Sequence, residues 1–390
     1  LYDMADYVNV TGEITTRDSF YVFRLNNGMM ALFNDFWTIN PGNYLMLAKN
    51  SIRTKNFKLR GLKGQEMVFK SLGDKGLEVE LQRFDISQVN AFIPIEALKV
   101  GGVYSGTIAV KELFALKDFN VKLSAENFLI NDDDYGKMTL NATTRDLKSI
   151  LSGDLRIYMD SMRLTSHFEH YFESTQEHQK KYTEVWSDVE NYPAAMLEYF
   201  AGSSVNNTEG NFDASFKIFG YPQMLHLDGM LHADSFATTV DYLNNRVYLT
   251  NQSFVLTDSI ISCHECLMKD GEGNSAVING GIAHDYLNNL RYDVQLKSDN
   301  FMALNTTKGM NQYYYGRAFG AFEAEIKGPL SSPNMVIDGK SNKGTDLIFP
   351  LTAEQFTEER RFIQFGKQDS TNNTTTLVKK SGVTMELNLQ

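Results

Sequence analysis

The sequence has little of several features that would point directly to a function. Its 390 residues include only two cysteines and seven prolines, and its net charge is −11. Two cysteines exclude a disulfide-rich scaffold but leave the redox compartment open. The negative charge argues against a nucleic-acid partner, because phosphate binding needs clustered Lys and Arg. No apolar run approaches the roughly 18 residues of a membrane helix, so we expect the chain to be soluble.

The two ends of the sequence suggest a piece of a longer protein. The chain starts at Leu1 without a Met, and it stops within the alternating stretch "VTMELNLQ". We therefore expect a fragment from which any targeting segment is missing. With 42% hydrophobic and 22% charged residues, the part at hand is globular in composition rather than disordered.

What the sequence does have is alternation of apolar and polar residues. In "GNFDASFKIFG", Phe212, Phe216 and Ile218 point to one face, while Asp213 and Lys217 point to the other. This period of two is typical of strands with one apolar and one wet face. Short links such as "NNG", "KDGEGN" and "SNKG" supply the Gly, Asn and Asp that tight hairpins need. The sequence therefore predicts a long antiparallel meander.

A coarse repeat accompanies the alternation. Residues 104–128, 210–236 and 320–344 each combine an alternating strand, a kinked link and a second alternating strand. Such repetition favours an elongated fold in which each unit stacks on its neighbour.

Residues 166–202 interrupt the pattern. This stretch is rich in Glu, Gln, Lys and His, and Phe168, Tyr171 and Phe172 fall at helical spacing. We predict a short helical insertion of one or two helices that ends near Gly202.

The apolar face of such a meander must be covered in water. A second packed sheet, a closed barrel, or a sheet curled along its length around an apolar trough would each do so. Spacing alone does not choose among the three.

The stretch "ISCHECLM" holds both cysteines and is the strongest candidate for chemistry. In a regular strand, Cys263 and Cys266 would point to opposite faces about 10 Å apart, too far for a disulfide. Haem attachment needs a His where Leu267 stands, and zinc needs more ligands than one Cys pair offers. A structural strand is favoured over a thiol or metal function. We predict no catalytic residue, no metal and no cofactor.

A second candidate for metal binding is the HxxH spacing of His167 and His170, with His178 nearby. On a helix both His would share one face. A solvated polar helix face is the preferred interpretation.

From Phe254 to its end, the chain resembles a known family. The residues that carry the resemblance are "DGEGNSAVINGGIAHDYLNNLRYDVQLKSDNFMALNTT" and "YYYGRAFGAFEAEIKGPLSSPNMVIDGKSNKGTDLIFPL". Their order is similar to the C-terminal region of TamB proteins, particularly the Bacteroidetes type, within the AsmA-like, bridge-like lipid-transfer superfamily. Residues 83–110 resemble the preceding repeats. The 166–202 segment and the early end of the chain depart from the family pattern.

The resemblance implies an all-β fold, an elongated antiparallel β-taco or half-pipe with an apolar concave groove. It divides the chain into β-taco repeats (1–165), the helical insertion (166–202) and a truncated C-terminal region (203–390). It also implies a non-enzymatic protein of the periplasm, held in the inner membrane by an N-terminal anchor that is missing here. Such a protein moves phospholipid to the outer membrane, supports outer-membrane protein assembly and meets a barrel of the TamA or TamL type.

Within that interpretation, the groove residues are the inward members of the alternating strands. The predicted lipid-groove residues are Phe212, Phe216, Ile218, Leu225, Leu227, Ile278, Ile282, Val294, Leu296, Phe322, Ile326, Met335, Ile337, Leu387 and Leu389. The alternative hypothesis is an interaction scaffold without lipid conduction, in which the last strands add to a TamA-, TamL- or BamA-type partner by β-augmentation.

Overall fold

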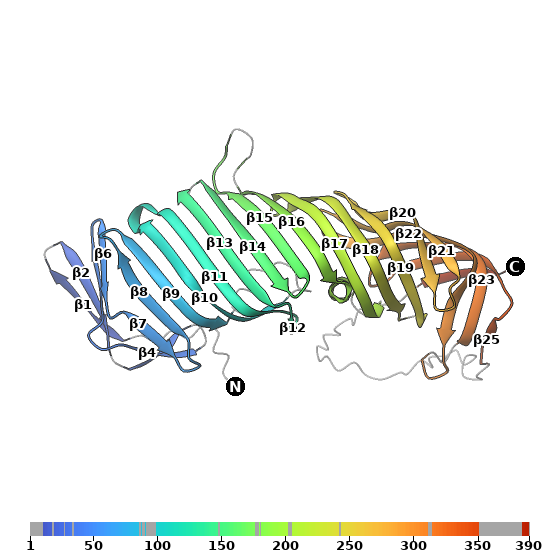
Figure 1. The fold of residues 1–390 in the computed structure, drawn as a ribbon, viewed down its shortest axis with the longest axis horizontal. Coiled ribbons are helices and arrows are strands. Elements are labelled where there is room, and N and C mark those ends of the chain that lie inside the picture. Colours follow the sequence, from blue (N-terminus) through green and yellow to red (C-terminus); the bar gives the residue numbers. More distant parts are fainter. Residues whose placement is uncertain are drawn as a thin grey trace, which may run out of the picture. The chain divides into compact units, whose positions relative to one another are not determined.

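The computed structural model describes residues 11–17, 19–26, 28–32, 35–85, 87, 90, 99–146, 149–175, 179, 181–201, 205–241, 243–310, 314–350 and 384–389 (Figure 1). The chain divides into two units. Unit 1 comprises residues 1–192 and 213–229, and unit 2 comprises residues 193–212 and 230–390. Strands β17 (Val205–Tyr221) and β18 (Met224–Val240) each contribute to both units. Within the described ranges, no helix is both long and apolar enough to span a membrane.

Unit 1 contains a small sheet and a long ladder. The small sheet has the order β1-β2-β5-β6. Its strands are β1 (Gly12–Arg17), β2 (Phe20–Leu25), β5 (Tyr44–Ala48) and β6 (Ser51–Lys55). The ladder is formed by β3 (Met29–Leu32), β4 (Asp35–Ile39), β7 (Lys58–Gly61), β8 (Glu66–Leu72), β9 (Gly76–Asp85), β10 (Val100–Glu112), β11 (Lys117–Ile130), β12 (Asp133–Asp134), β13 (Lys137–Asp146), β14 (Ile150–Met159), β15 (Met162–Tyr171) and β16 (Tyr182–Pro193). Between β10 and β11 lies the 3-10 turn η2 (Leu113–Ala115).

Unit 2 repeats the ladder with longer strands. It contains η3 (Ala194–Leu197), α1 (Glu198–Ala201), β19 (Asn245–Leu256), β20 (Ile260–Asp270), β21 (Ser275–Asp285), β22 (Asn288–Thr306), β23 (Tyr315–Pro329), β24 (Asn334–Ser341), β25 (Asp346–Ile348) and β26 (Thr384–Leu389). Strands β19 to β24 pair antiparallel in chain order, and β26 pairs parallel to β24. The predicted antiparallel all-β fold is confirmed in both units. The domain limits at 165 and 203 stay predictions.

Glycines placed within strands let neighbouring backbones approach closely where the ladders bend. Gly102 of β10 has a φ of +103°, beside a register shift against β11, and a Cβ there would lie 2.0 Å from the Asn127 carbonyl oxygen. Gly280 of β21 has a φ of +93°, and a Cβ would lie 2.1 Å from the Asp293 carbonyl oxygen. Only glycine fits these positions without strain, and such mid-strand sites introduce curvature into a sheet.

The predicted helical insertion is wrong over most of its length. Residues 166–171 belong to β15 and residues 182–193 to β16, which pair with each other in register. The cross-strand contacts include Ser166 with Ser187, at 2.8 Å between their hydroxyl oxygens, and the His167 ring beside Trp186. Helical conformation is confined to the short η3 and α1, and Gly202 lies outside the described residues. Aromatic and β-branched residues suit a pleated, half-buried surface. This preference for a strand outweighed the helical spacing of the apolar residues.

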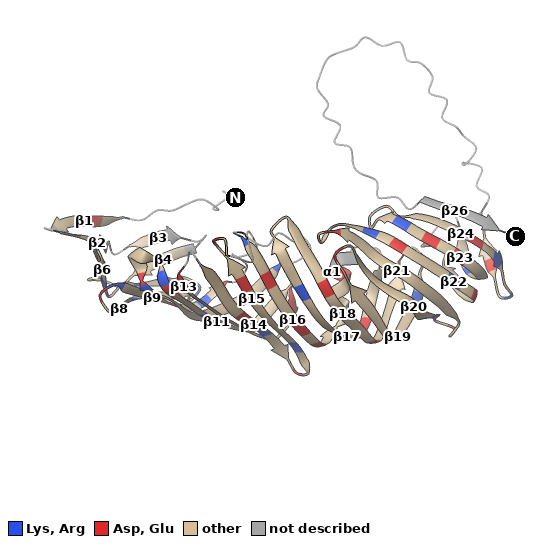
Figure 2. Ribbon diagram, turned by 90° about the horizontal axis from the view of Figure 1, so that it is seen from above, with Lys and Arg blue, Asp and Glu red and all other residues tan. Residues whose placement is uncertain are grey.

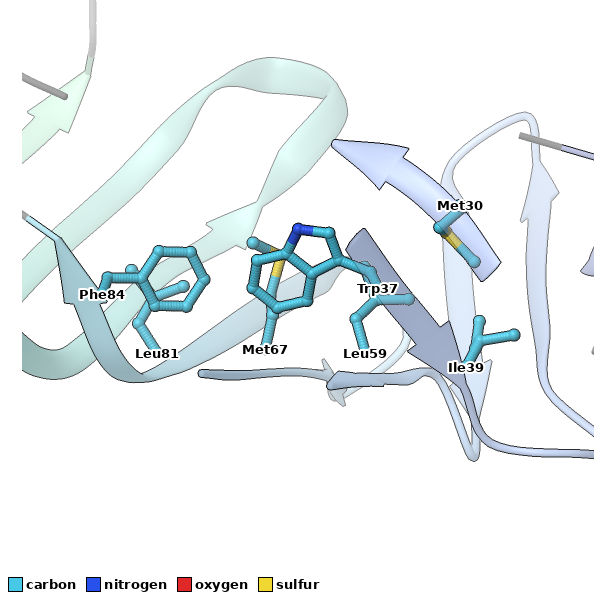
Figure 3. Close-up of a cluster of buried hydrophobic side chains, with 7 residues drawn as sticks. All are labelled: Met30, Trp37, Ile39, Leu59, Met67, Leu81 and Phe84. Atoms are coloured by element: carbon cyan, nitrogen blue, oxygen red, sulfur yellow. The ribbon is translucent and has the colours of Figure 1, made fainter. Parts of the chain in front are cut away.

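A dry hydrophobic core lies at the first strands of the unit 1 ladder. We call it the Trp37 cluster, and its members are Met30, Trp37, Ile39, Leu59, Met67, Leu81 and Phe84 (Figure 3). Trp37 is only 2% exposed and stacks on Phe84 with 5.5 Å between ring centroids. Here the apolar face is covered completely, as in an ordinary globular core.

Candidate functional site

The strands of unit 2 present one apolar and one charged face. Residues directly opposite each other in an antiparallel pair share a face. One line of such partners runs Ile278, Leu296, Ala324 and Ile337 across β21 to β24. The next line runs Gly280, Val294, Ile326 and Met335 across the same strands. We call these two lines the apolar rows of unit 2.

Charged residues of both signs are interspersed along the same strands (Figure 2), and the register places Asp293, Lys297, Glu323 and Lys327 on the face opposite the rows. Lys297 lies opposite Glu323, and their side chains form an ion pair with 2.5 Å between Nζ and Oε1. The hydrogen bond from Lys297 lowers the pKa of the Glu323 carboxyl. Both side chains are about two-thirds exposed, so this pair keeps the face wet rather than stabilising the fold.

Most of the predicted groove residues are neither buried nor fully exposed. Phe212 and Leu227 are buried, at 8% and 6% exposure. The structure leaves eleven others partly exposed: Phe216, Ile218, Leu225, Ile278, Ile282, Val294, Leu296, Phe322, Ile326, Met335 and Ile337. Partial exposure of so many aliphatic and aromatic side chains on one face differs from a closed core. It is the exposure expected of an apolar surface that the described residues do not cover completely.

The last two predicted groove residues lie in β26. The parallel register places Leu387 opposite Ile337 and Leu389 opposite Gly339. Their side chains lie outside the described part of the structure.

Sequence reasoning missed an equivalent surface in unit 1. Cross-strand partners form a line from β8 to β16, which we call the apolar row of unit 1: Phe69, Val79, Ile108, Val121, Ala142, Gly153, Phe168 and Val185. A neighbouring line includes Leu123, Leu140 and Leu155, all partly exposed. The alternation in "VYSGTIAV" and "SGDLRIYMD" was the signal that could have found these residues.

One part of unit 2 is an ordinary core. Phe301 of β22 is 3% exposed and packs with Val247 and Ala276, and Phe322 lies against this cluster. The rings of Phe301 and Phe322 meet edge-on, with 6.3 Å between centroids. Phe322 therefore lies at the boundary between this core and the apolar rows of unit 2.

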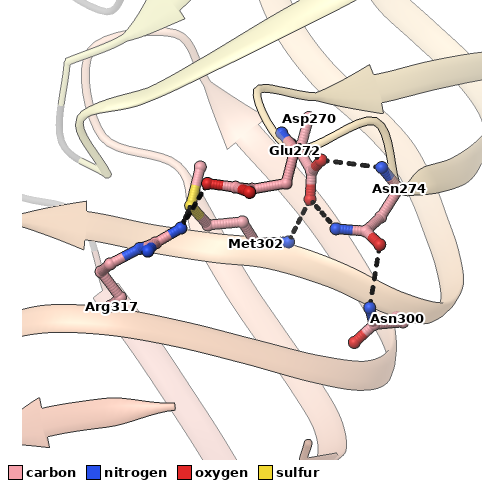
Figure 4. A network of polar contacts seen from close by, with 6 residues as sticks. All are labelled: Asp270, Glu272, Asn274, Asn300, Met302 and Arg317. Atoms are coloured by element: carbon pink, nitrogen blue, oxygen red, sulfur yellow. Dashed lines mark hydrogen bonds and ion pairs between the residues drawn. The ribbon is translucent and has the colours of Figure 1, made fainter. Parts of the chain in front are cut away.

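A buried carboxylate fixes the backbone around that core (Figure 4). Asp270 is 2% exposed, and its oxygens accept hydrogen bonds from the backbone N–H groups of Glu272 and Asn274, both at 2.9 Å. They also accept from the Asn274 side chain at 2.8 Å and from the Met302 backbone N–H at 2.7 Å. The predicted "KDGEGN" turn is thereby tied to β22, and Asp270 has a structural role.

The cysteines lie differently from the prediction. Cys263 is opposite Gly280 and Cys266 is opposite Ile278, so three residue steps in β20 match two in β21. This bulge turns both side chains to one face, whereas a regular strand would separate them. Both thiols are free and buried. Burial, followed by the neighbouring Cys266 thiol, raises the pKa of the Cys263 thiol to about 12.

The histidines of the HxxH spacing also lie apart, because β15 is a strand. His167 contacts Asp154 at 3.0 Å on the outer face. His170 lies on the other face, with its Nδ1 2.8 Å from the Thr183 hydroxyl, and burial lowers its pKa. His178 lies outside the described residues. Within the described ranges, no three His, Cys, Asp or Glu side chains are grouped so that they could hold a metal ion.

A small pocket of about 170 Å³ lies at the turns of unit 1, lined by Asn50, Lys75, Glu112, Phe114 and Ala115. Small-molecule sites usually measure about 300–1,000 Å³ and are lined mainly by apolar groups. This pocket therefore does not suggest an active site.

Comparison with known families gives one match: residues 265–390 match the TamB C-terminal domain. Comparisons with curated proteins and with solved structures give no match. The matched range includes Cys266, the Asp270 turn and the whole of the apolar rows of unit 2. It overlaps the motifs that carry the resemblance in the sequence. The similarity to the TamB family is therefore carried by residues 265–390, through its C-terminal domain.

Proposed function

We propose that the apolar rows of unit 1 and those of unit 2 each line a lipid path, along which phospholipid acyl chains move between the inner and outer membranes. In this proposal the protein works in the periplasm, performs no chemistry and meets an outer-membrane barrel of the TamA or TamL type. An N-terminal anchor outside this chain holds it at the inner membrane. The TamB assignment supports a general role in outer-membrane assembly and lipid transport.

The observation that carries the proposal is the partial exposure of the apolar rows. A side chain that only completes a core is covered by its own chain, as Leu59 and Trp37 are at 4% and 2% exposure. Val294 and Leu296 in the rows of unit 2, and Leu155 beside the row of unit 1, remain partly exposed although their neighbours on the same face are apolar. Such a surface is stabilised when an apolar ligand covers it.

The dimensions suit an acyl chain. Phe69, Val79 and Ile108 of the row of unit 1 pack against the Trp37 cluster. The rest of the row crosses five strands, from β11 to β16, so four strand spacings of about 4.8 Å give a length of roughly 19 Å. One leaflet of a bilayer's hydrocarbon core is about 15 Å thick, half of the usual 30 Å, so an extended acyl chain is shorter than the row.

The energetics explain why such a path needs no catalytic group. Each CH₂ group exposed to water costs about 0.8 kcal/mol, so a chain of fifteen such groups would lose on the order of 12 kcal/mol on leaving its membrane. A continuous apolar wall removes most of that cost at every step. The charged outer face leaves the protein itself hydrated.

A matched pair of variants on β22 tests the proposal. Leu296 points to the apolar face, and its neighbour Gln295 is exposed on the polar face. Leu296→Asp should lower the phospholipid that co-purifies without detergent by at least about tenfold, because placing a carboxylate against acyl chains costs more than about 1.4 kcal/mol. Gln295→Asp adds the same charge and should leave the bound phospholipid unchanged.

Mass spectrometry of extracted lipid measures the outcome, and the urea midpoint of each variant shows whether the fold is retained. Equal phospholipid in both folded variants would contradict lipid binding by this face. Capture of a barrel partner by a lipid-free protein would instead favour the scaffold function through β-augmentation.

A further inference from the structure

The bulge in β20 brings the two cysteines within reach of each other. Their partners Ile278 and Gly280 are two residues apart in β21, so the Cα atoms of Cys263 and Cys266 are separated by about 6.7 Å along the strand. A disulfide spans Cα atoms up to about 6.8 Å apart. The register therefore shortens the roughly 10 Å of a regular strand to the upper end of the disulfide range, and the bond would draw the two Cβ atoms together to about 4 Å.

Side chains from both neighbouring strands hold this bulge in place. Glu265 adopts a positive φ of 53°, and its backbone N–H donates to the Asn279 side-chain oxygen at 2.9 Å. The Leu267 backbone N–H donates to the Gln252 side-chain oxygen at 3.1 Å. Two backbone N–H groups at the bulge are thus satisfied by side chains, which marks the bulge as a defined feature of the strand.

The sulfur atoms share one apolar environment. Cys263 and Cys266 are 6% and 3% exposed. The Cys263 Sγ lies 4.0 Å from the Ile278 carbonyl oxygen and the Cys266 Sγ lies 3.8 Å from the Ser253 carbonyl oxygen. Cys266 is close enough to raise the pKa of the Cys263 thiol. Cys266 lies in line with Ile278 and Leu296, so the pair lies on the face of the apolar rows of unit 2. No third His, Cys, Asp or Glu among the described residues joins them, which leaves oxidation as the chemistry open to the pair.

We propose that Cys263 and Cys266 are a redox pair that closes into an intramolecular disulfide across the β20 bulge. The oxidant is a disulfide of a small thiol or a thiol-oxidising protein. One protein thiolate attacks that disulfide and releases one thiol. The second cysteine then attacks the mixed disulfide and releases the other. The protein loses two protons and two electrons, and the oxidant gains them as two thiols.

The bond fixes the offset between β20 and β21, because the one-residue bulge can no longer move along the strand. Burial and the high pKa of Cys263 make attack of its thiolate on the oxidant slow in the folded protein. The disulfide therefore forms before β20 is fully buried during folding, or when β20 locally unfolds. This inference is independent of lipid transport, since it depends only on the register and the two thiols.

The test compares the folded chain with the same chain in denaturant, each equilibrated in glutathione redox buffers. Equilibrium is approached from both the reduced and the oxidised protein, so that slow access of glutathione to the buried thiols does not affect the result. Thiols are trapped by alkylation, and intact mass gives the fraction of disulfide. The folded chain should favour the disulfide by about tenfold over the denatured chain, since the fold raises the effective concentration of one thiol at the other.

Two variants make the comparison specific. Cys263→Ser must show no intramolecular disulfide, and Asn279→Ala, which removes the acceptor for Glu265, should reduce the preference of the folded chain. A folded chain that is no more oxidised than the denatured chain, or that carries glutathione on one cysteine in place of the disulfide, overturns the proposal.

Discussion

The Trp37 cluster packs against the first members of the apolar row of unit 1, Phe69, Val79 and Ile108. The later part of that row, on β11 to β16, is built from the same kinds of residue on the same ladder, yet it differs from the cluster in what covers it. Leu59 in the cluster is 4% exposed, whereas Leu155, beside the row, remains partly exposed. In the cluster, β3 and β4 bring Met30 and Trp37 over the sheet (Figure 3). The difference shows that an apolar face becomes core only where the chain folds back onto it.

The largest expected effect comes from applying one substitution to both regions. Leu59→Ala should lower the free energy of unfolding by about 2–5 kcal/mol, because it opens a cavity in a closed core. Leu155→Ala should cost only about 1 kcal/mol, since a partly exposed side chain has less apolar surface to lose. Urea unfolding of the two variants measures the difference. Similar losses would mean that the row is as tightly packed as the cluster.

A second contrast concerns the polar network of unit 2 (Figure 4). Asp270→Ala should cost about 2–3 kcal/mol, because buried N–H groups of the turn and of Met302 lose their acceptor. Glu272→Ala removes the exposed ion pair with Arg317 and should change stability by less than about 1 kcal/mol. Thermal unfolding distinguishes the two. A cost for Glu272→Ala as large as that for Asp270→Ala would contradict the structural role given to the buried carboxylate.

The smallest effect compares the two faces of β15 through their histidines. Burial lowers the pKa of His170, so the folded state resists its protonation and the unfolded state binds the proton more readily. Stability is therefore retained above the usual His pKa and lost as the pH falls through that range. Between about pH 7.5 and about pH 5.5, where a His titrates, His170→Gln should show a smaller fall in melting temperature than the unmodified chain. His167→Gln, on the outer face, is the matched control, and an equal change in both variants would contradict this account.

The sequence was a good guide wherever local patterning decides structure. Alternation around Phe216, Val294 and Phe322 predicted strands, and the Gly- and Asn-rich link at 269–274 predicted the turn that Asp270 organises. The sequence was a poor guide where the pairing of strands decides the structure. Phe168, Tyr171 and Phe172 fit a helical spacing, but cross-strand partners in β14 and β16 made this segment a strand.

Two further features could not be predicted from a single strand's pattern. The side on which Cys266 lies depends on one extra residue in β20, and a bulge is a property of two strands together. Whether Leu155 or Leu296 is covered depends on what folds over the sheet, which alternation does not encode. The alternation indicated which residues share a face but not which of those faces are closed.

Photo-crosslinking in cells tests the central claim most directly. A photoreactive residue at Leu155 or Leu296 faces the apolar rows, and one at Arg156 or Gln295 occupies the next position on the opposite face. We predict that the first two positions capture phospholipid and that the second two do not. Capture of protein alone, or of no lipid, at Leu155 and Leu296 would contradict a lipid path along this face.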